Sequence, residues 1–241
     1  MGSEMILLAI WENLIKVTAM KDISIRPAST IIIVRNFSSA PTVLMGQRGS
    51  KAAFMPNKFV FPGGAVDEGD SNIHLVETLT KKCQARLKEE NQGPSPKTLA
   101  VAAIRELWEE TGLVLGVSEP WDDAPQDWSD FADAGFRPSA KNMYFFFRAI
   151  TPPGKSRRFD ARFFLVDADH LSGDLDDFSG ASDELSHLQW VPLDEVRTLD
   201  LPFITSVVLG ELSGLISIGP PVSVPFFKNK DEESFLRLEN S

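Results

Sequence analysis

The feature that most limits how this chain can fold is an acidic segment near its middle, residues 102–112 (AAIRELWEETG). The spacing of its apolar residues predicts a helix, and Gly112 stands where a C-terminal cap glycine belongs. Residues four apart on a helix share a face, so Glu106 and Glu110 project together with Glu109 beside them. Each like-charged pair on an exposed helix costs about 0.2–0.5 kcal/mol, and a bound cation reverses that penalty. This cluster of hard oxygen ligands therefore suits Mg²⁺.

A glycine-rich loop upstream of the helix supports the same interpretation. Residues 59–70 (FVFPGGAVDEGD) combine a short apolar strand with two adjacent glycines. Glycine lets the backbone approach a ligand closely, so a main-chain carbonyl here can become another oxygen ligand. Three further carboxylates lie in the same loop: Asp67, Glu68 and Asp70. Without this loop, the acidic helix is at least as typical of a solvated face with ordinary surface glutamates.

Together the loop and the helix resemble the Nudix box, whose pattern is G-x5-E-x7-R-E-U-x-E-E-x-G-U, with U an aliphatic residue. Gly64 fits the first glycine, and Asp70 stands where the family has glutamate. The insertion is long, since 34 residues separate Asp70 from Arg105 where the pattern has seven, an excess of 27. The second half of the box matches at every fixed position, namely Arg105, Glu106, Leu107, Glu109, Glu110, Gly112 and Leu113.

The rest of the chain resembles a Nudix subgroup with a long insertion inside the box, which includes peroxisomal coenzyme A diphosphatases. The resemblance covers residues 26 to about 213 and is less specific than the box itself. It is carried by the strings RPASTIIIVRN, QRGS, FMPNKFVFPGG, RRFDARFF at 157–164, and WVPLDEV followed by LPF at 190–203.

The resemblance implies an α/β (α+β) fold, a Nudix-type α/β/α sandwich with a mixed sheet, built as a single domain with a helical insertion. We expect the domain over residues 23–218 with the insertion at about 71–98, an N-terminal extension at 1–22 and a C-terminal tail at 219–241. The tail has three prolines and a polar end, so we expect it to dock loosely or not at all. Residue patterns predict strands at 29–36, 42–48, 143–150, 159–166 and 187–192, helices at 72–90, 98–111 and 202–214, and an irregular loop at 117–139.

The implied activity is Mg²⁺- or Mn²⁺-dependent hydrolysis of a diphosphate bond in a nucleoside diphosphate linked to another moiety. Coenzyme A or an acyl derivative is the leading substrate, while ADP-ribose, dinucleotides and oxidised nucleotides stay open. One alternative is a catalytically silent Nudix module that binds a nucleotide or a protein partner. Another is a helical scaffold whose acidic face binds nothing.

The family pattern also assigns roles to individual residues. It implies that Glu106 and Glu110 bind metal directly, that Glu109 assists them, and that Gly64 offers its carbonyl. Arg105 is expected to orient the glutamates by hydrogen bonding rather than to contact substrate.

Other site residues follow from their place in the chain. Candidates for the general base are Asp183 and Glu184, in the loop before the last strand. Glu184 is the preferred one, although a solvated loop acid explains it equally well. Arg158 and Arg162 share one face of a strand with Asp160 and are candidates for phosphate contacts. A surface ion-pair ladder with Asp160 is the alternative explanation. Arg48, which ends the second strand, is a further candidate for binding phosphate.

Composition narrows the classes of partner. A formal net charge of −10 argues against non-specific binding to nucleic acid or to an anionic membrane. The single cysteine, Cys83, cannot form an intrachain disulfide, and with three scattered histidines a structural zinc site is not expected. No membrane span or signal peptide is evident in the sequence, so we expect a cytoplasmic protein. Its partner would be a small nucleoside-diphosphate-type molecule, and homodimerisation is left open.

Overall fold

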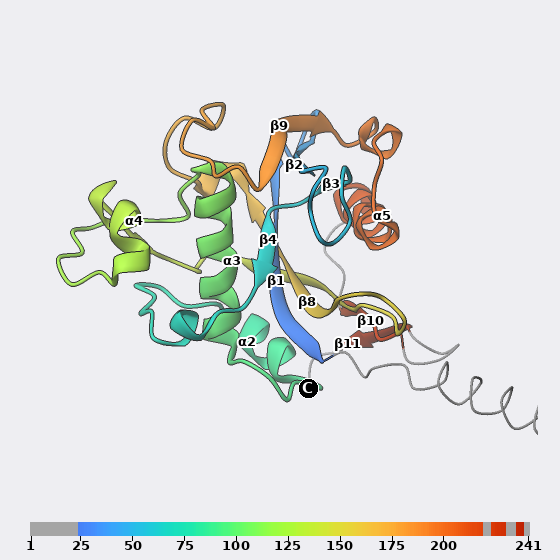
Figure 1. The fold of residues 1–241 in the computed structure, drawn as a ribbon, viewed down its shortest axis with the longest axis horizontal. Coiled ribbons are helices and arrows are strands. Elements are labelled where there is room, and N and C mark those ends of the chain that lie inside the picture. Colours follow the sequence, from blue (N-terminus) through green and yellow to red (C-terminus); the bar gives the residue numbers. More distant parts are fainter. Residues whose placement is uncertain (1–23, 219–222, 230–234, 239–241) are drawn as a thin grey trace, which may run out of the picture.

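A nine-stranded mixed sheet forms the centre of the computed structural model, which describes residues 24–218, 223–229 and 235–238 (Figure 1). Its strand order is β11-β10-β7-β8-β1-β2-β3, with β4 paired to β1 and β9 paired to β2. The strands are β1 (Ile25–Arg35), β2 (Thr42–Arg48), β3 (Phe59–Val60), β4 (Gly63–Ala65), β7 (Tyr144–Ile150), β8 (Arg158–Asp167), β9 (Leu185–Pro192), β10 (Val224–Phe227) and β11 (Phe235–Leu238).

The central strand of this sheet is β1, whose β-branched run is buried on both faces. Ile31, Ile32 and Ile33 are fully inaccessible to solvent, as a strand covered on both sides requires. β1 pairs in parallel with β8 and antiparallel with both β2 and β4. The mixed sheet that the resemblance implied is therefore confirmed.

Two long helices cover opposite faces of the sheet, α3 (Pro96–Thr111) on one side and α5 (Phe203–Ile218) on the other (Figure 1). A hydrophobic core lies on each face of the sheet, and alternate residues of β1 contribute to the two. Ile31 packs with the α3 layer, and Ile32 packs with the α5 layer. The α/β/α sandwich follows from this alternation, because successive side chains of a strand point to opposite faces.

The smaller helices depart from the sequence predictions. The helix predicted at 72–90 is reduced to α2 (Lys81–Lys88), because the Thr80 hydroxyl accepts from Cys83 N and starts the helix there. Residues 72–79 are irregular, and their apolar side chains Ile73, Leu75 and Leu79 are buried, at most 3% exposed. The irregular loop predicted at 117–139 contains a small hairpin and short helices: β5 (Gly116–Ser118), η2 (Gln126–Trp128), α4 (Ser129–Asp133) and β6 (Phe136–Pro138).

The C-terminal tail corrects another expectation. β10 pairs in parallel with β7, and Val224 and Phe226 on it are 0% and 1% exposed. The prediction of loose docking is therefore wrong for residues 224–227, whose apolar side chains extend the core despite the prolines nearby. The domain boundaries stay a prediction, and the whole extension at 1–22 lies outside the described residues.

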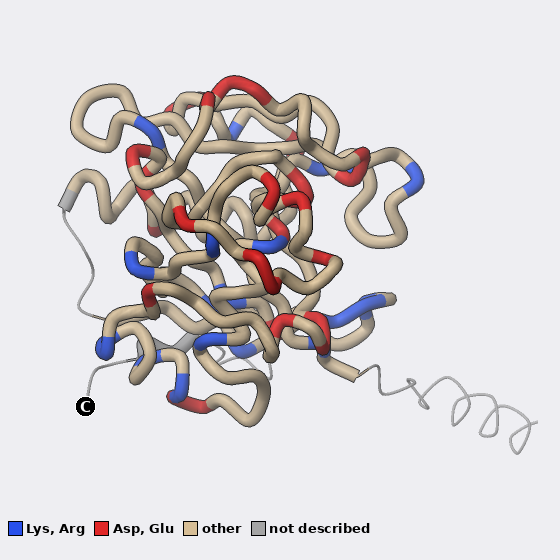
Figure 2. Tube along the Cα trace, turned by 90° about the vertical axis from the view of Figure 1, so that its left-hand side faces the viewer, with Lys and Arg blue, Asp and Glu red and all other residues tan. Residues whose placement is uncertain are grey.

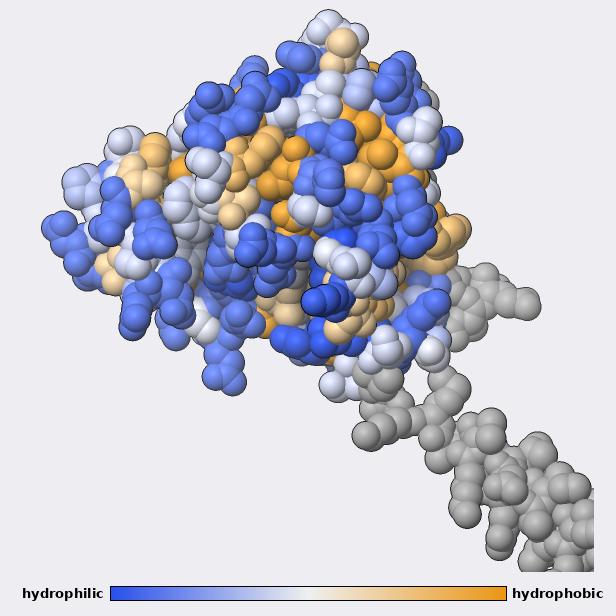
Figure 3. Space-filling view, turned by 45° about the horizontal axis from the view of Figure 1, so that its top comes forward, coloured by the Kyte–Doolittle hydropathy of each residue, from blue (hydrophilic) through white to orange (hydrophobic). Residues whose placement is uncertain are grey.

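Within the part of the chain that the structure describes, no helix combines the length and the apolar character needed to cross a membrane. On the face shown in Figure 3, hydrophilic side chains predominate and the hydrophobic ones form separate patches.

Docking of β10 generates a stability prediction. Phe226→Ala removes a buried ring and should lower the free energy of unfolding by about 3–5 kcal/mol, measured by urea denaturation. Phe203→Ala, at a ring that is 72% exposed, is the control and should change it by less than about 1 kcal/mol. Equal effects of the two substitutions would contradict the docking of β10.

Candidate active site

The helix that carries the acidic cluster, α3, has well-defined ends. The Ser95 hydroxyl accepts from Thr98 N at 3.1 Å, and Pro96 occupies the first turn, where its missing N–H costs nothing. Gly112 ends the helix in the left-handed conformation with φ of 74°, as predicted from the sequence. The helix and its C-terminal glycine cap are therefore confirmed.

The acidic face of α3 lies directly against β4, which contains the two adjacent glycines. Gly63 N donates to Glu110 Oε2 at 2.7 Å. A Cβ atom at Gly64 would overlap the carboxylate of Glu106, so only glycine permits this approach. The structure thus brings Gly64, Glu106 and Glu110 together from two segments separated by the insertion.

Arg105 organises the carboxylates around it. Its Nε donates to Asp70 Oδ1 at 2.9 Å, and its Nη1 donates to Glu106 Oε1 at 3.0 Å and to Glu109 Oε2 at 2.9 Å. Its Nη2 donates to the carbonyl oxygen of Ala65 at 3.0 Å, which ties α3 to the end of β4. These contacts suit the orienting role that the family pattern implies, which stays a prediction.

Asp70, which departs from the family pattern, is the most buried partner of Arg105. It is 1% exposed, and its Oδ2 accepts from Asp67 N at 2.8 Å. The shorter aspartate therefore still reaches the guanidinium. Sequence reasoning counted it among the loop carboxylates and missed this pairing, although its place in the box was the available signal.

Burial dominates the electrostatics of the cluster. Desolvation raises the pKa of Glu106 to about 7 and that of Glu110 to about 8, against the opposing effects of Arg105 and the Gly63 amide respectively. Desolvation also raises the pKa of Glu109. The positive charge near these carboxylates does not offset their burial. A divalent cation that prefers hard oxygen ligands would supply the missing positive charge. The donor set therefore fits Mg²⁺ or Mn²⁺.

This fit concerns the donor chemistry and not a finished coordination shell. Within residues 24–218, 223–229 and 235–238, no three His, Cys, Asp or Glu side chains are already arranged to hold a metal ion. The hydrogen bonds of Arg105 to Glu106 and Glu109 direct oxygens toward the guanidinium.

Two further predicted residues lie near the cluster. The negative charge of Glu184 contributes to the raised pKa of both Glu106 and Glu110, and the positive charge of Arg48 opposes it at Glu110. The loop that carries Glu184 is held against α3, because Ser182 N donates to the carbonyl oxygen of Glu109 at 2.8 Å. Glu184 is exposed and can meet both a substrate and bulk water.

The other two predicted arginines are not with the cluster. Arg158 Nε donates to the carbonyl oxygen of Thr151 at the start of β8, and its substrate contact stays a prediction. Arg162 is 1% exposed and pairs with Asp160 at 2.9 Å, while burial lowers its pKa to about 10. A side chain so enclosed cannot reach substrate phosphate, so we correct that prediction. The ion pair with Asp160 exists, but it is buried and not on the surface.

Acidic side chains are numerous on the side of the molecule where α3 and α4 lie. In Figure 2 red segments gather near the middle of this view, with blue segments between and around them. An anionic substrate approaching this side would need local cations, either arginines such as Arg48 or bound metal.

Comparison with known proteins places this site in a family. Residues 94–208 match the family model described as NUDIX domain. The chain is 31% identical over 179 residues to "Putative nudix hydrolase 7" of Caenorhabditis elegans, covering 69% of this chain and 51% of that protein. It is also 31% identical over 106 residues to "Acyl-coenzyme A diphosphatase NUDT19" of Xenopus laevis, covering 35% of this chain and 28% of that protein. The chain thus spans about half or less of the length of these relatives.

A solved structure agrees in fold. The crystal structure of a NUDIX hydrolase from Alicyclobacillus acidocaldarius has a TM-score of 0.60 and 25% identity, covering 83% of this chain and 94% of that chain. The chain therefore carries a Nudix domain. The resemblance to the Nudix family drawn from the box is confirmed for this domain.

The contact between Gly64 and Glu106 generates a prediction for metal binding. Gly64→Ala should push the Glu106 carboxylate aside and abolish most of the rise in melting temperature that Mg²⁺ or Mn²⁺ causes, measured by differential scanning fluorimetry. Gly69→Ala is the matched control, because a Cβ there meets no atom within 4 Å. An undiminished metal response in Gly64→Ala would contradict the site.

Proposed function

We propose that this chain hydrolyses a phosphoanhydride bond in a nucleoside diphosphate linked to another moiety, with Mg²⁺ or Mn²⁺ held by the acidic cluster. The observation that carries the proposal is the close contact of β4 with Glu106 and Glu110. It brings carboxylates and a main-chain strand to one point, as a cation site for phosphate chemistry requires. Family membership supports the same reaction class.

The proposed division of labour uses the residues of this cluster. Glu106 and Glu110 would hold the metal with Glu109 assisting, and the Gly64 carbonyl would add an oxygen ligand. Arg105 would keep the carboxylates oriented from behind, since its donors are directed at them and at Ala65. When bound, the metal would neutralise phosphate charge and polarise the phosphoryl group.

Two residues outside the helix would complete the reaction. Glu184 would accept the proton of the attacking water, because it is exposed and its charge acts on both Glu106 and Glu110. Arg48 would contact a substrate phosphate, where a guanidinium can make two parallel hydrogen bonds. Its Nε already donates to the carbonyl oxygen of Phe54, which leaves the two Nη groups to turn toward the site.

Coenzyme A or an acyl-coenzyme A is our proposed substrate class. The support is the partial match to a protein described as an acyl-coenzyme A diphosphatase and the long insertion inside the box. A screen of diphosphate compounds with and without Mg²⁺, read by mass spectrometry, tests this choice. Much faster cleavage of ADP-ribose than of any coenzyme A species would reject it while leaving the hydrolase proposal intact.

Glu110→Gln tests the metal-dependent reaction. The substitution keeps the shape of the side chain but removes the charge that a cation needs, so turnover should fall at least about 100-fold. The far-ultraviolet circular dichroism should be unchanged. Glu119→Gln, at an exposed carboxylate paired with Arg137, is the control and should keep wild-type turnover.

A screen in which no compound is cleaved distinguishes a hydrolase from a binding module. If the wild-type chain cleaves none of the compounds but still binds a nucleotide, it is a silent binding module and the hydrolase proposal fails. If Glu110→Gln turns over at the wild-type rate, the assignment of the metal site to this helix fails.

Glu184→Gln separates the base from the metal ligands. Loss of a general base should lower kcat by about 100-fold or more. The Mg²⁺-induced rise in melting temperature should persist, since Glu184 holds no metal in this scheme. Wild-type kcat in this variant would show that Glu184 is a solvated loop acid and not the general base.

A further inference from the structure

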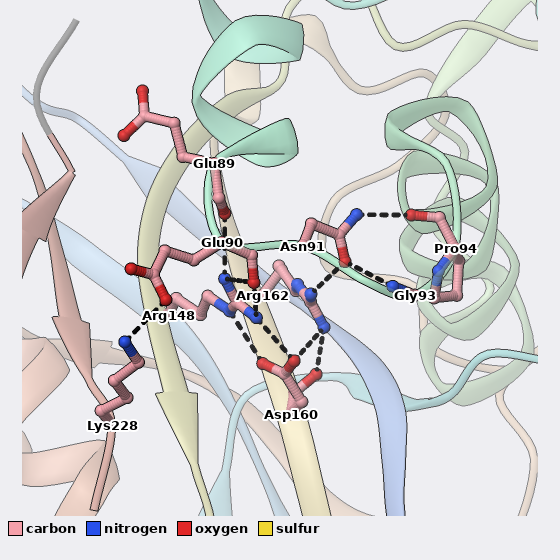
Figure 4. Close-up of polar contacts among 9 residues, drawn as sticks. All are labelled: Glu89, Glu90, Asn91, Gly93, Pro94, Arg148, Asp160, Arg162 and Lys228. Atoms are coloured by element: carbon pink, nitrogen blue, oxygen red, sulfur yellow. Dashed lines mark hydrogen bonds and ion pairs between the residues drawn. The ribbon is translucent and has the colours of Figure 1, made fainter.

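Arg162 belongs to a second polar cluster, buried between the sheet and the α2–α3 loop (Figure 4). Arg148 on β7 and Arg162 on β8 share the carboxylate of Asp160. Arg148 donates to it from Nε at 2.9 Å and from Nη2 at 2.8 Å, and Arg162 Nη1 lies 2.9 Å from Oδ2. Arg162 and Arg148 are 1% and 4% exposed. We call these three residues the Arg–Asp–Arg cluster.

Each of the two arginines also donates to the loop between α2 and α3. Arg148 Nη1 donates to the main-chain carbonyl oxygens of Glu89 at 3.2 Å and Glu90 at 3.3 Å. Arg162 Nη2 donates to Asn91 Oδ1 at 2.9 Å. Two buried guanidinium groups therefore fasten the end of the insertion to the sheet.

Asn91 links Arg162 by hydrogen bonds to the segment that precedes α3. Its Nδ2 donates to the carbonyl oxygen of Pro94 at 2.8 Å, and its Oδ1 accepts from Gly93 N at 3.0 Å. The next residue, Ser95, is the N-cap of α3. A chain of hydrogen bonds thus runs from Arg162 through Asn91 to Pro94, the residue just before the N-cap.

The same loop is held in an unfavourable backbone conformation. Glu90 has φ of 51°, a left-handed conformation that persists in a non-glycine residue only where its surroundings enforce it. Arg148 holds its carbonyl oxygen, and Lys228, just after β10, pairs with its carboxylate at 2.6 Å. Several independent contacts therefore fix where this loop lies.

We propose that Arg162 is a positioning residue for the metal site: through Asn91 it fixes where α3 begins, and so how Glu106 and Glu110 meet β4. This inference rests on the proposed function. Glu106 lies eleven residues after Ser95, about 16 Å along a helix that moves as a unit. At that distance the Glu106 carboxylate fills the space beside Gly64 and Glu110 accepts from Gly63 N, so a shift of the helix would alter both contacts.

Core packing of α3 and a hydrogen bond from Ser29 to the Leu99 carbonyl oxygen also hold the helix. Loss of Arg162 should therefore shift the helix slightly and not unfold it. Misplacement of a reacting group by about 1 Å can cost about 100-fold in rate. The effect is expected at the carboxylates more than in overall stability.

The experiment compares Arg162→Met and Asn91→Ala with wild type, using the amide of Gly63 as a reporter. That amide donates to Glu110, so its hydrogen exchange measured by NMR reports the position of the α3 carboxylates without metal or substrate. Both variants should exchange this amide about 10-fold faster and bind Mn²⁺ about 10-fold more weakly by calorimetry. Arg137→Met, which removes an arginine paired with Glu119 on the β5–β6 hairpin, is the control and should match wild type.

Two results would overturn the positioning role: wild-type exchange at Gly63 and wild-type Mn²⁺ affinity in folded Arg162→Met, or the same in Asn91→Ala. Asn91→Ala leaves the Arg–Asp–Arg cluster intact and decides the matter if Arg162→Met does not fold. Arg162→Lys keeps the charge but lacks the planar guanidinium whose separate nitrogens contact Asp160 and Asn91, so it should recover only part of the loss. Failure of the proposed function shows itself separately, as wild-type protein that neither binds Mn²⁺ nor cleaves diphosphates.

Discussion

The approach of two glutamate side chains to an adjacent pair of glycines is the contact on which the rest of this structure depends. Glu110 accepts from Gly63 N, and Glu106 occupies the space that a side chain at Gly64 would need. Neither segment could form this contact alone, because the carboxylates belong to a helix and the glycines to a strand of the sheet. Packing of α3 on the sheet brings the carboxylates into contact with the glycines.

Placing several carboxylates close together in a buried site raises the free energy of the folded state, and neighbouring polar groups offset only part of this penalty. Arg105 donates to Asp70, Glu106 and Glu109 and to the end of β4. Burial still raises the pKa of Glu106 and Glu110 well above the ordinary range of glutamate. Acids held in this way suit a bound cation, and the proposed hydrolysis of a phosphoanhydride by an acidic chain would require one.

The insertion inside the box is part of the core and not a loose excursion. Ile73, Leu75, Leu79, Cys83 and Leu87 from it pack into the α3-side core. Hydrogen bonds from Arg148 and Arg162 hold its end to the sheet. The 27 extra residues therefore lengthen the path between loop and helix while the geometry at their two ends is kept.

Local signals predicted much of the fold and the site. The N-cap of α3 was not predicted, but Gly112 marked the end of the helix. The box pattern singled out Gly64 and Glu106 although an insertion of 27 residues separates its two halves. Contacts between segments far apart in sequence were not predictable in this way. The burial of Arg162 depends on Asp160 and Asn91 together, which strand alternation alone cannot reveal. The burial of Phe226 depends on the pairing of β10 with β7. The start of α2 depends on Thr80, whose side chain caps the helix at its N-terminus instead of lying inside a longer helix.

The most direct test of the central contact is a crystal structure with Mn²⁺ located by its anomalous scattering. The account predicts a peak within direct coordination distance, about 2.0–2.3 Å, of carboxylate oxygens of Glu106 and Glu110 and of the Gly64 carbonyl oxygen. Peaks found only at other carboxylates, with Glu106 and Glu110 still directed at Arg105 and Gly63, would contradict it.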